Sequence, residues 1–476
     1  MATDTKFTRR NRITIYLMLL GSFLGGIDQT ILSPALPSIM TDLHIDAVSG
    51  QWLTTIFLLI NGIMVPCTAY LMARFTTRQL YLTAMGIFGV GSLIAGLSST
   101  FLVLLCARVL QALGFGILMP LLTASILMVY PPSQHGKAMG MIGLVFSVAP
   151  AIGPSMAGFI VDRYGWNDIF LLLAALVLVD VVLSAIIMPK DGTVEHIPLD
   201  LTSVIMSSIG FGGLLYSFSC VGSHGWLSAH FILPLIAGAV TLVLFIKRQD
   251  HLETPLLSFQ AFKNKQFTVG AIIAMVMNAV LLFGMVLTPI YLQDIHGYSA
   301  LVSALIMLPS ALLSAFINLF VGHLYDRYGG REIILSGLLI ITLGSVFYAF
   351  FQKDSSLPFL VISYSIRIIG INIVMTPITT WSMAPFRGDA IPHANALLNT
   401  MRQIAGSIGT AIFVSIYTIM QHTVDMPLLD SSLIGIRVAF GVSAVVSGLA
   451  FILAYYKVDK HQRIKIIKAK KHKKTA

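Results

Sequence analysis

The chain alternates between long apolar stretches and short polar breaks along almost its whole length. The stretches 13–24, 80–97, 170–188 and 231–246 are examples. A bilayer core of about 30 Å is crossed by about 20 helical residues, and a helix pairs its backbone N–H and C=O groups within itself. The pattern therefore predicts an all-α protein that crosses a membrane many times.

Charged and turn residues separate the stretches, for example at Asp42, Arg78, Pro131-Pro132 and Gly329-Gly330. We expect about fourteen helical spans, near residues 13–37, 50–73, 79–98, 101–128, 138–162, 168–188, 202–222, 230–247, 268–292, 300–325, 332–351, 357–384, 398–420 and 433–456. The predicted parts are a cytoplasmic tail (1–12), a six-helix bundle (13–190), two inserted helices with their linkers (191–266), a second six-helix bundle (267–456) and a basic cytoplasmic tail (457–476).

Composition agrees with a membrane protein. Of the 476 residues, 56% are hydrophobic and 11% are charged, and the mean hydropathy is +0.86. Soluble proteins carry about 25% charged residues. A chain with so few charges cannot cover its own surface for water, which excludes an ordinary soluble protein.

The net charge of +10 suggests nucleic-acid binding, but the distribution of the positive residues favours a membrane surface. With a cytoplasmic N-terminus, most Lys and Arg residues fall on the cytoplasmic side, and only Arg163, Lys353 and Arg437 fall outside. We therefore expect a multi-pass plasma-membrane protein with both termini in the cytoplasm and no nucleic-acid partner. The first apolar run exceeds a signal-peptide core and lacks a cleavage site, so we interpret it as a retained span.

Three features of the first half recur in the same order in the second half. Residues 69–78 align with residues 322–331, each at the end of an apolar span. A lone arginine within an apolar span then appears as Arg108 and again as Arg367, and a glycine-rich helix follows in each half. The repeats predict two homologous halves of six spans.

An acid and an arginine lie within the hydrocarbon-spanning stretches of the first half. Asp28 lies in the first span, and such carboxyl groups usually face a cavity or a partner and serve as proton relays. Arg108 lies in the fourth span and needs a counter-charge or carbonyl groups, so Asp28 is its expected partner. The alternatives are an Asp28 that orients helices without titrating and an Arg108 satisfied by carbonyls alone.

Two further motifs consist of small and charged residues. The fifth span contains Gly153, Pro154 and Gly158, which allow close helix packing and bending. The segment after the tenth span contains a set of glycines and charges that can form a locking network: Gly322, Asp326, Arg327, Gly329 and Arg331.

Together these motifs resemble the major facilitator superfamily, in particular its fourteen-span drug/proton antiporters of the EmrB/QacA/LmrB type, along nearly the whole chain. The resemblance implies two six-helix bundles with two inserted helices, a substrate site at the midplane and alternating access. It implies proton coupling by Asp28 and Arg108, and an antiporter motif at Gly153, Pro154 and Gly158, where Ala157 replaces a usual glycine. It assigns the gate to Arg74, Arg78, Gly322, Asp326, Arg327, Gly329 and Arg331. The first copy lacks the acid and the glycines, so the second should carry more of the locking.

Three other charges have no assigned role. Asp180 lies in the middle of the sixth span, where it has a coupling role, faces the inserted spans or is protonated. Arg367 is a candidate for a second coupling charge or a structural charge, and Arg402 for a side chain that reaches the interface. Candidates to line a substrate cavity are Asp28, Gln111, Trp52, Phe146, Tyr291, Phe316 and Trp381.

The sequence is best explained by a proton-driven exporter of lipophilic, often cationic, small molecules that works as a monomer in the lipid bilayer. No GxxxxGK[ST], HExxH or GxSxG signature occurs, so we expect neither ATP hydrolysis nor an enzyme. The cysteines Cys67, Cys106 and Cys220 form no CxxC, and we expect no metal and no cofactor. The alternatives are a same-fold exporter of a specific metabolite, peptide or anionic compound, an importer, and a non-transporting membrane scaffold or receptor.

Overall fold

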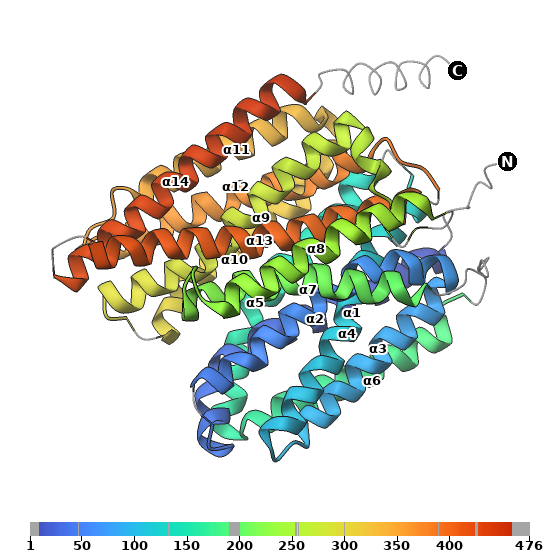
Figure 1. Cartoon of the computed structure of the whole chain (residues 1–476), viewed down its shortest axis with the longest axis horizontal. Coiled ribbons are helices and arrows are strands. Elements are labelled where there is room, and N and C mark those ends of the chain that lie inside the picture. The colour runs from blue at the N-terminus through green and yellow to red at the C-terminus, as the bar shows by residue number, and fades with distance from the viewer. Residues whose placement is uncertain are drawn as a thin grey trace. The chain divides into compact units, whose positions relative to one another are not determined.

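The computed structural model describes residues 9–45, 47–131, 134–189, 200–252, 255, 257–298, 300–388, 390–423 and 427–458. These ranges contain fourteen α-helices and no strand (Figure 1). The helices are α1 (Arg9–Asp42), α2 (Ala47–Arg74), α3 (Thr77–Gly96), α4 (Phe101–Val129), α5 (His135–Arg163), α6 (Trp166–Ile187), α7 (Leu201–His224), α8 (Ala229–His251), α9 (Lys265–Ile290), α10 (Ala300–Tyr328), α11 (Gly330–Tyr348), α12 (Leu357–Met383), α13 (Ala390–Thr423) and α14 (Leu428–Lys457). A 3₁₀ turn η2 (Phe259–Lys263) precedes α9, and a π-helical turn η3 (Tyr291–Ile295) follows it.

The predicted all-α membrane architecture is confirmed. Twelve helices in the described ranges are long and apolar enough to cross a membrane. The remaining two, α2 and α7, contain shorter apolar stretches, Trp52–Met64 and Thr202–Phe218. A count of fourteen membrane spans therefore stays a prediction, although all fourteen expected helices are present.

Helix ends differ from the expected span ends where polar residues continue the helix. α1 begins at Arg9, whereas hydropathy predicts a first span from residue 13. α13 begins at Ala390, whereas hydropathy predicts its span from residue 398. Hydropathy marks the part of a helix that fits the hydrocarbon core, and backbone hydrogen bonds can extend the helix beyond it.

The two copies of the repeated segment differ in backbone conformation at the turn that precedes the next helix. In the first copy Thr76 has φ −64° and ψ 151°, and it forms a capping box with Gln79 at the start of α3. The aligned residue in the second copy, Gly329, has φ +91° just before α11, a conformation that favours glycine. Replacement of glycine by threonine in the first copy therefore accompanies a different backbone turn.

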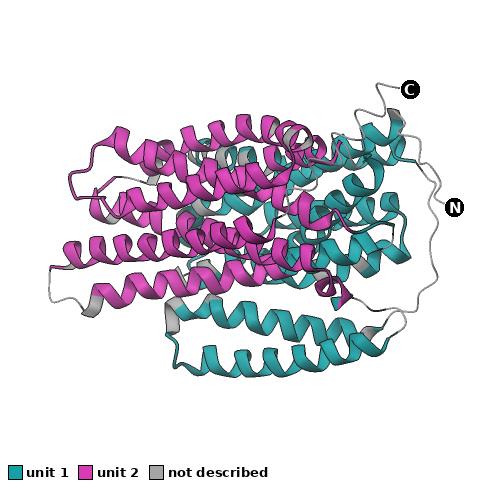
Figure 2. Ribbon diagram, turned by 90° about the horizontal axis from the view of Figure 1, so that it is seen from above, with its two compact units in different colours: residues 1–131, 145–259, 386–400 teal, residues 132–144, 260–385, 401–476 magenta. Residues whose placement is uncertain are grey.

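Contacts divide the chain into two compact units, drawn in different colours in Figure 2. The first unit contains residues 1–131, 145–259 and 386–400, and the second contains residues 132–144, 260–385 and 401–476. Each unit thus includes a short stretch of α5 or α13 whose helix continues in the other unit. The inserted helices α7 and α8 belong to the first unit.

Helix pairing follows the same pattern in the two units. In the first unit, α1, α2 and α3 pack against α4, and α3 also packs against α6. In the second unit, α9, α10 and α11 pack against α12, and α11 also packs against α14. Every pair recurs eight helices later, as expected for two six-helix halves separated by two inserted helices.

The inserted helices pack closely on one another and on the first half. Gly213 of α7 has no room for a side chain, since a Cβ atom there would lie 2.8 Å from the carbonyl oxygen of Pro234 in α8. The ring of Tyr216 in α7 stacks on Trp52 of α2, with 5.8 Å between ring centroids. Small residues bring the helices together in the way that is common between membrane helices.

Candidate functional site

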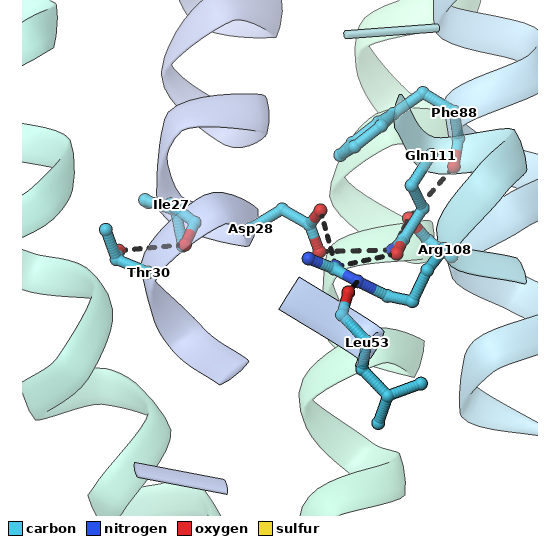
Figure 3. Close-up of polar contacts among 8 residues, drawn as sticks. Ile27, Asp28, Thr30, Leu53, Phe88, Arg108 and Gln111 are labelled. Atoms are coloured by element: carbon cyan, nitrogen blue, oxygen red, sulfur yellow. Dashed lines mark hydrogen bonds and ion pairs between the residues drawn. The ribbon is translucent and has the colours of Figure 1, made fainter. Parts of the chain in front are cut away.

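A buried ion pair joins α1 to α4 in the first unit (Figure 3). Asp28 is 0% exposed and Arg108 is 1% exposed. The Arg108 Nη1 group donates to Asp28 Oδ2 over 2.9 Å. The ion pair expected from the sequence is therefore present, and the alternative of an Arg108 bound by carbonyls alone is wrong.

Gln111, one turn after Arg108, completes the shell around the carboxylate. Its Nε2 group donates to Asp28 Oδ1 over 3.1 Å and to Ser92 Oγ over 3.0 Å. Its Oε1 atom accepts from Arg108 Nη1 over 2.9 Å. Ser92 in turn donates to the Phe88 carbonyl over 2.9 Å. Both Asp28 oxygens accept a hydrogen bond and each of these donor hydrogens has its own acceptor, which is the arrangement that an ionised carboxylate requires.

The guanidinium of Arg108 has two further contacts with α2. Its Nε group donates to the Leu53 carbonyl over 3.3 Å, and its Cζ atom lies 4.4 Å from the centroid of the Phe57 ring. A desolvated cation gains from both a carbonyl and an aromatic face. α2 therefore helps to hold Arg108 while α1 supplies the counter-charge.

Glycines allow the close helix approach on which this cluster depends. A Cβ atom on Gly25 of α1 would lie 2.1 Å from the Phe115 ring of α4. A Cβ atom on Gly91 of α3 would lie 2.8 Å from the backbone nitrogen of Gln111. Substitution at either position would separate helices that carry members of the network.

The glycine and proline residues of α5 that were predicted to form an antiporter motif lie beside the ion pair, where Gly153 contacts α1. A Cβ atom on Gly153 would lie 2.2 Å from Thr30 Oγ1, two residues after Asp28. Pro154 follows within α5, where a proline removes a backbone hydrogen bond and bends the helix. A Cβ atom on Gly158 would meet no neighbour within 4 Å, so packing in this conformation does not require glycine there.

An apolar groove of about 310 Å³ runs along α1, α5 and α6. Ile27 and Ile31 of α1 line it, together with other apolar side chains, and neither Asp28 nor Arg108 does. Figure 3 shows Ile27 and Asp28 extending from α1 in different directions. The groove is therefore separate from the charged cluster.

Comparison with known proteins identifies the family. A model of the Major Facilitator Superfamily matches residues 18–410. The chain belongs to the major facilitator superfamily. It is therefore a multi-pass membrane transporter.

Similar facilitators include several bacterial proteins. The transporter is 38% identical over 444 residues to the uncharacterised MFS-type transporter YcnB of Bacillus subtilis (93% of this chain, 94% of that protein). It is 36% identical over 451 residues to the lincomycin resistance protein LmrB of the same organism (92% and 94%). It is 26% identical over 403 residues to the multidrug resistance protein B homolog of Mycobacterium tuberculosis (84% and 75%). The resemblance to LmrB-type facilitators inferred from the motifs is thus confirmed.

Solved structures agree on the fold. The human organic anion transporter MFSD10 superposes on the transporter with a TM-score of 0.67 and 16% sequence identity. The match covers 94% of this chain and 100% of the human one. At this identity the likeness establishes the architecture alone.

Arg367 of the facilitator lies in α12, the helix that corresponds to α4 in the repeat, but its environment differs from that of Arg108. It is buried, it donates through Nη2 to the Val280 carbonyl of α9, and its Nε and Nη1 atoms have no hydrogen-bond partner. Its Cζ atom lies 4.9 Å from the Phe283 ring and 5.1 Å from the Phe440 ring. Within the described residues no acid pairs with Arg367, so none of them gives this arginine an ion pair like that of Arg108.

Asp180 of α6 faces α1 and α3, and not the inserted helices as one alternative proposed. It is 0% exposed, and its Oδ2 atom lies 2.7 Å from the Tyr81 hydroxyl of α3. Its Oδ1 atom has no partner. The inserted helices contact α2 instead, which removes them as the surroundings of this carboxyl group.

The gating candidates lie near helix ends with varied partners. Arg74 donates to the Tyr70 hydroxyl over 3.0 Å, and Arg78 donates to the Ala185 carbonyl. Arg331 donates to the Tyr455 carbonyl over 2.8 Å, and Arg327 is exposed. The side chain of Asp326 lies outside the described residues, so a network centred on it stays a prediction.

Glycine packing adds a contact that the gate prediction did not include. A Cβ atom on Gly322 of α10 would lie 2.1 Å from the Gly136 carbonyl at the start of α5. Asn318 of α10 donates to the Gly143 carbonyl over 2.9 Å. α5 and α10 therefore cross with almost no side chains between them in the second unit.

Candidates for the substrate cavity are scattered. Tyr291 is buried and donates to the Gln352 carbonyl over 2.8 Å, and Trp381 is buried in the second unit. Trp52 stacks on the inserted helix α7, and Phe316 is 61% exposed. The side chain of Phe146 lies outside the described residues. The structure brings Asp28 and Gln111 of this set into direct contact.

Several residues of the cluster were not predicted. Ser92, Leu53 and Phe57 join it from α3 and α2. Ser92 has a weak sequence signal as a polar residue beside Gly91 in an apolar run, whereas Leu53 contributes only its backbone carbonyl and could not be recognised. Away from the cluster, the Arg402 carbonyl accepts from Asn278 of α9 over 2.8 Å, while the reach of its side chain to the interface stays a prediction.

Proposed function

We propose that the transporter is a proton-coupled antiporter that exports lipophilic, often cationic, drugs across the plasma membrane. The main support is the buried cluster of Asp28, Arg108 and Gln111, which places one carboxylate and one fixed cation in the middle of a membrane helix bundle. Relatives named for lincomycin and multidrug resistance support drugs as the substrate class.

The cluster suggests how a proton and a cationic substrate would compete. Arg108 keeps its charge at all relevant pH values, whereas Asp28 can be neutralised by a proton. A proton on Asp28 would break its attraction to Arg108, and a cationic substrate would need the same carboxylate in its ionised form. Each ligand then disfavours the other by the same coupling free energy, which is the requirement for exchange.

Neighbouring helices provide a route from this site to a conformational change. Asp28 holds α1 to α4, and Gly153 of α5 packs against Thr30 two residues further along α1. A change in the ion pair would thus alter α1 at a point where α5 has no side chain to absorb movement. Alternating access by a rocking bundle needs such closely packed, bistable contacts.

One observation favours a different substrate class. Arg367 is a buried cation with two nitrogen atoms lacking partners and with no acidic partner in the described ranges. Such a group would suit an anionic compound, so export of a specific anionic metabolite is the second candidate. Both candidates share the fold and differ in the charge of the substrate.

Efflux from cells tests the proposal. Ethidium efflux would be followed in cells with wild type, Asp28→Asn, Asp28→Glu and the control Asp200→Asn, an acid at the start of α7. We expect gradient-driven efflux by the wild type and the control, loss in Asp28→Asn with the protein still in the membrane, and partial activity in Asp28→Glu. Efflux that persists in Asp28→Asn, or after the proton gradient is collapsed, would refute the coupling role. Efflux of anionic probes alone would favour the second candidate.

A further inference from the structure

A second buried carboxyl group of the first unit has no part in the cluster around Asp28. Asp180 lies on the inner face of α6, whose opposite face is exposed and apolar, with Leu178 64% exposed and Ile186 71% exposed. α6 packs against α1 and α3. Asp180 therefore lies where an outer helix meets the other helices of the first unit.

The number of hydrogen atoms available at Tyr81 indicates whether the carboxyl group of Asp180 is protonated. The Tyr81 hydroxyl oxygen lies 2.7 Å from Asp180 Oδ2 and 2.8 Å from the Leu17 carbonyl oxygen of α1. Both distances are those of hydrogen bonds, and the tyrosine hydroxyl carries a single hydrogen. If Asp180 were a carboxylate, one of the two contacts would bring two lone pairs together without a hydrogen.

A protonated Asp180 supplies the hydrogen that the second contact lacks. With a proton on Oδ2, Asp180 donates to the Tyr81 oxygen, and Tyr81 donates its own hydrogen to the Leu17 carbonyl. Each short contact then contains one hydrogen. The unpartnered Oδ1 atom is also less costly in a neutral acid, because burial of a charged oxygen without a hydrogen bond is penalised more strongly than burial of a neutral one.

Charged groups near this part of α6 do not compensate a carboxylate. Among the residues that the structure describes, Asp180 takes part in none of the ion pairs. Arg78 of α3 donates to the Ala185 carbonyl, and Arg10 of α1 donates to the Ile187 carbonyl over 3.0 Å. Among the described side chains near the start of α1, those of Arg12 and Tyr16 are exposed.

The packing makes room for this hydroxyl group. A Cβ atom on Gly21 of α1 would lie 2.2 Å from the Tyr81 hydroxyl oxygen, so a glycine is needed where the phenol meets α1. Tyr81 itself is 0% exposed. α1, α3 and α6 thus meet at one buried hydroxyl group.

We propose that Asp180 is a protonated carboxylic acid that, through Tyr81, clamps α6 to α3 and α1, and that loss of this proton releases the clamp. The ligand of the site is a single proton, and its place is Asp180 Oδ2. The proposal is independent of the drug-efflux function, since it concerns only the state of α6. It contrasts with Asp28, whose two oxygens accept hydrogen bonds from Arg108 and Gln111.

Infrared spectroscopy of the purified full-length protein tests the charge state. The carbonyl stretching band of a protonated carboxylic acid would be recorded at neutral pH in wild type, Asp180→Asn and the matched control Asp28→Asn. We expect the band in wild type and in Asp28→Asn, and its loss in Asp180→Asn. An unchanged band in Asp180→Asn would overturn the proposal, as would a wild type without the band.

Two further variants keep the test valid if Asp180→Asn folds poorly. Tyr81→Phe retains the acid but removes its acceptor, so the same band should shift to the position of a carboxylic acid without a hydrogen bond. A band that does not move would overturn the assignment. The second variant is Asp180→Ala, which removes the hydrogen bond to Tyr81. The side-chain amide of Asp180→Asn can still donate this hydrogen bond.

Thermal unfolding then tests the clamp. We expect Asp180→Ala to melt below Asp180→Asn at neutral pH. As pH rises above the ordinary titration range of an aspartate, the wild type should lose thermal stability relative to Asp180→Asn, because the folded state keeps a proton that the unfolded chain releases, whereas the amide binds no proton in either state. Equal losses in Asp180→Asn and Asp180→Ala, or a difference that does not change with pH, would refute a proton-dependent clamp.

Discussion

Removal of the negative charge at Asp28 should strongly destabilise the folded transporter. Asp28→Asn preserves the shape of the side chain but leaves Arg108, which is 1% exposed, without a counter-charge. The guanidinium retains its hydrogen bonds to Gln111 and to the Leu53 carbonyl. It cannot lose its proton to escape the cost of burial, so the unpaired charge remains in the bundle.

The size of the effect follows from burial and distance. Removal of one partner of a buried ion pair costs about 3–5 kcal/mol. Two unit charges about 4 Å apart at an effective dielectric constant of about 20 attract by roughly 4 kcal/mol, which is consistent with that range. We therefore expect Asp28→Asn to be among the most destabilising single substitutions in the first unit.

The reverse substitution should cost less. Arg108→Gln leaves Asp28 without its cation, but a carboxyl group can take up a proton and become neutral. The double variant Asp28→Asn/Arg108→Gln contains no charge at the site. Replacement of a whole buried ion pair is far less costly than removal of one partner. The double variant should therefore be more stable than Asp28→Asn alone.

Melting of the four proteins under identical detergent conditions measures this difference. The expected order is wild type, then Arg108→Gln and the double variant, and last Asp28→Asn. Residues in direct contact deviate from additivity, whereas independent sites add. A double variant that falls below Asp28→Asn by the full Arg108→Gln increment would refute the assignment of an energetically coupled ion pair.

Two other predictions test the packing and the surface charges. Gly114→Ala would place a Cβ atom 2.4 Å from the Ala84 carbonyl oxygen. The overpacking cost of about 1–3 kcal/mol should exceed the helix-propensity gain of about 1 kcal/mol. We therefore expect a lower melting temperature and weaker efflux. Burial pushes the pKa of Asp200 up, but hydrogen bonds from Arg248 and Ser203 outweigh burial and hold this pKa below its usual value. The ionised Asp200 side chain therefore stabilises the folded state at neutral pH, and this stabilisation is lost as pH falls. Because Arg248 is 40% exposed, the stabilisation is small. Asp200→Asn should cost less than about 1 kcal/mol in melting experiments at neutral pH and nothing at acidic pH.

Much of the fold could be predicted because membrane helices are encoded locally. A helix in hydrocarbon must satisfy its own backbone, so a run of apolar residues is enough to identify it. The repeat was also visible, because residues 69–78 and 322–331 keep their arginines at equal spacing. The ends of α1 and α13 were less predictable, since hydropathy ceases to report on a helix once it leaves the hydrocarbon.

The candidate site was predictable only where the sequence limits the choice of partner. Asp28 is one of few acids in the apolar spans of the first half, so Arg108 had an identifiable partner. Asp180 was visible as a buried acid, but its partner Tyr81 lies 99 residues away among many other tyrosines. The Leu53 carbonyl could not be recognised at all, because every residue has a backbone carbonyl.

Differences between the two halves bear on how the transporter could couple ions to substrate. Arg108 and Arg367 occupy equivalent helices, and α1 and α9 supply their partners in the two halves. In the first half α1 supplies the Asp28 carboxylate, and in the second half α9 supplies the Val280 carbonyl while two phenylalanine rings cover the cation. A carbonyl and a ring cannot take up a proton. Among the described residues, a proton that acts through the partner of Arg108 or Arg367 can therefore do so only in the first half. Coupling of this kind would have one bundle sense the proton while the other keeps a constant charge.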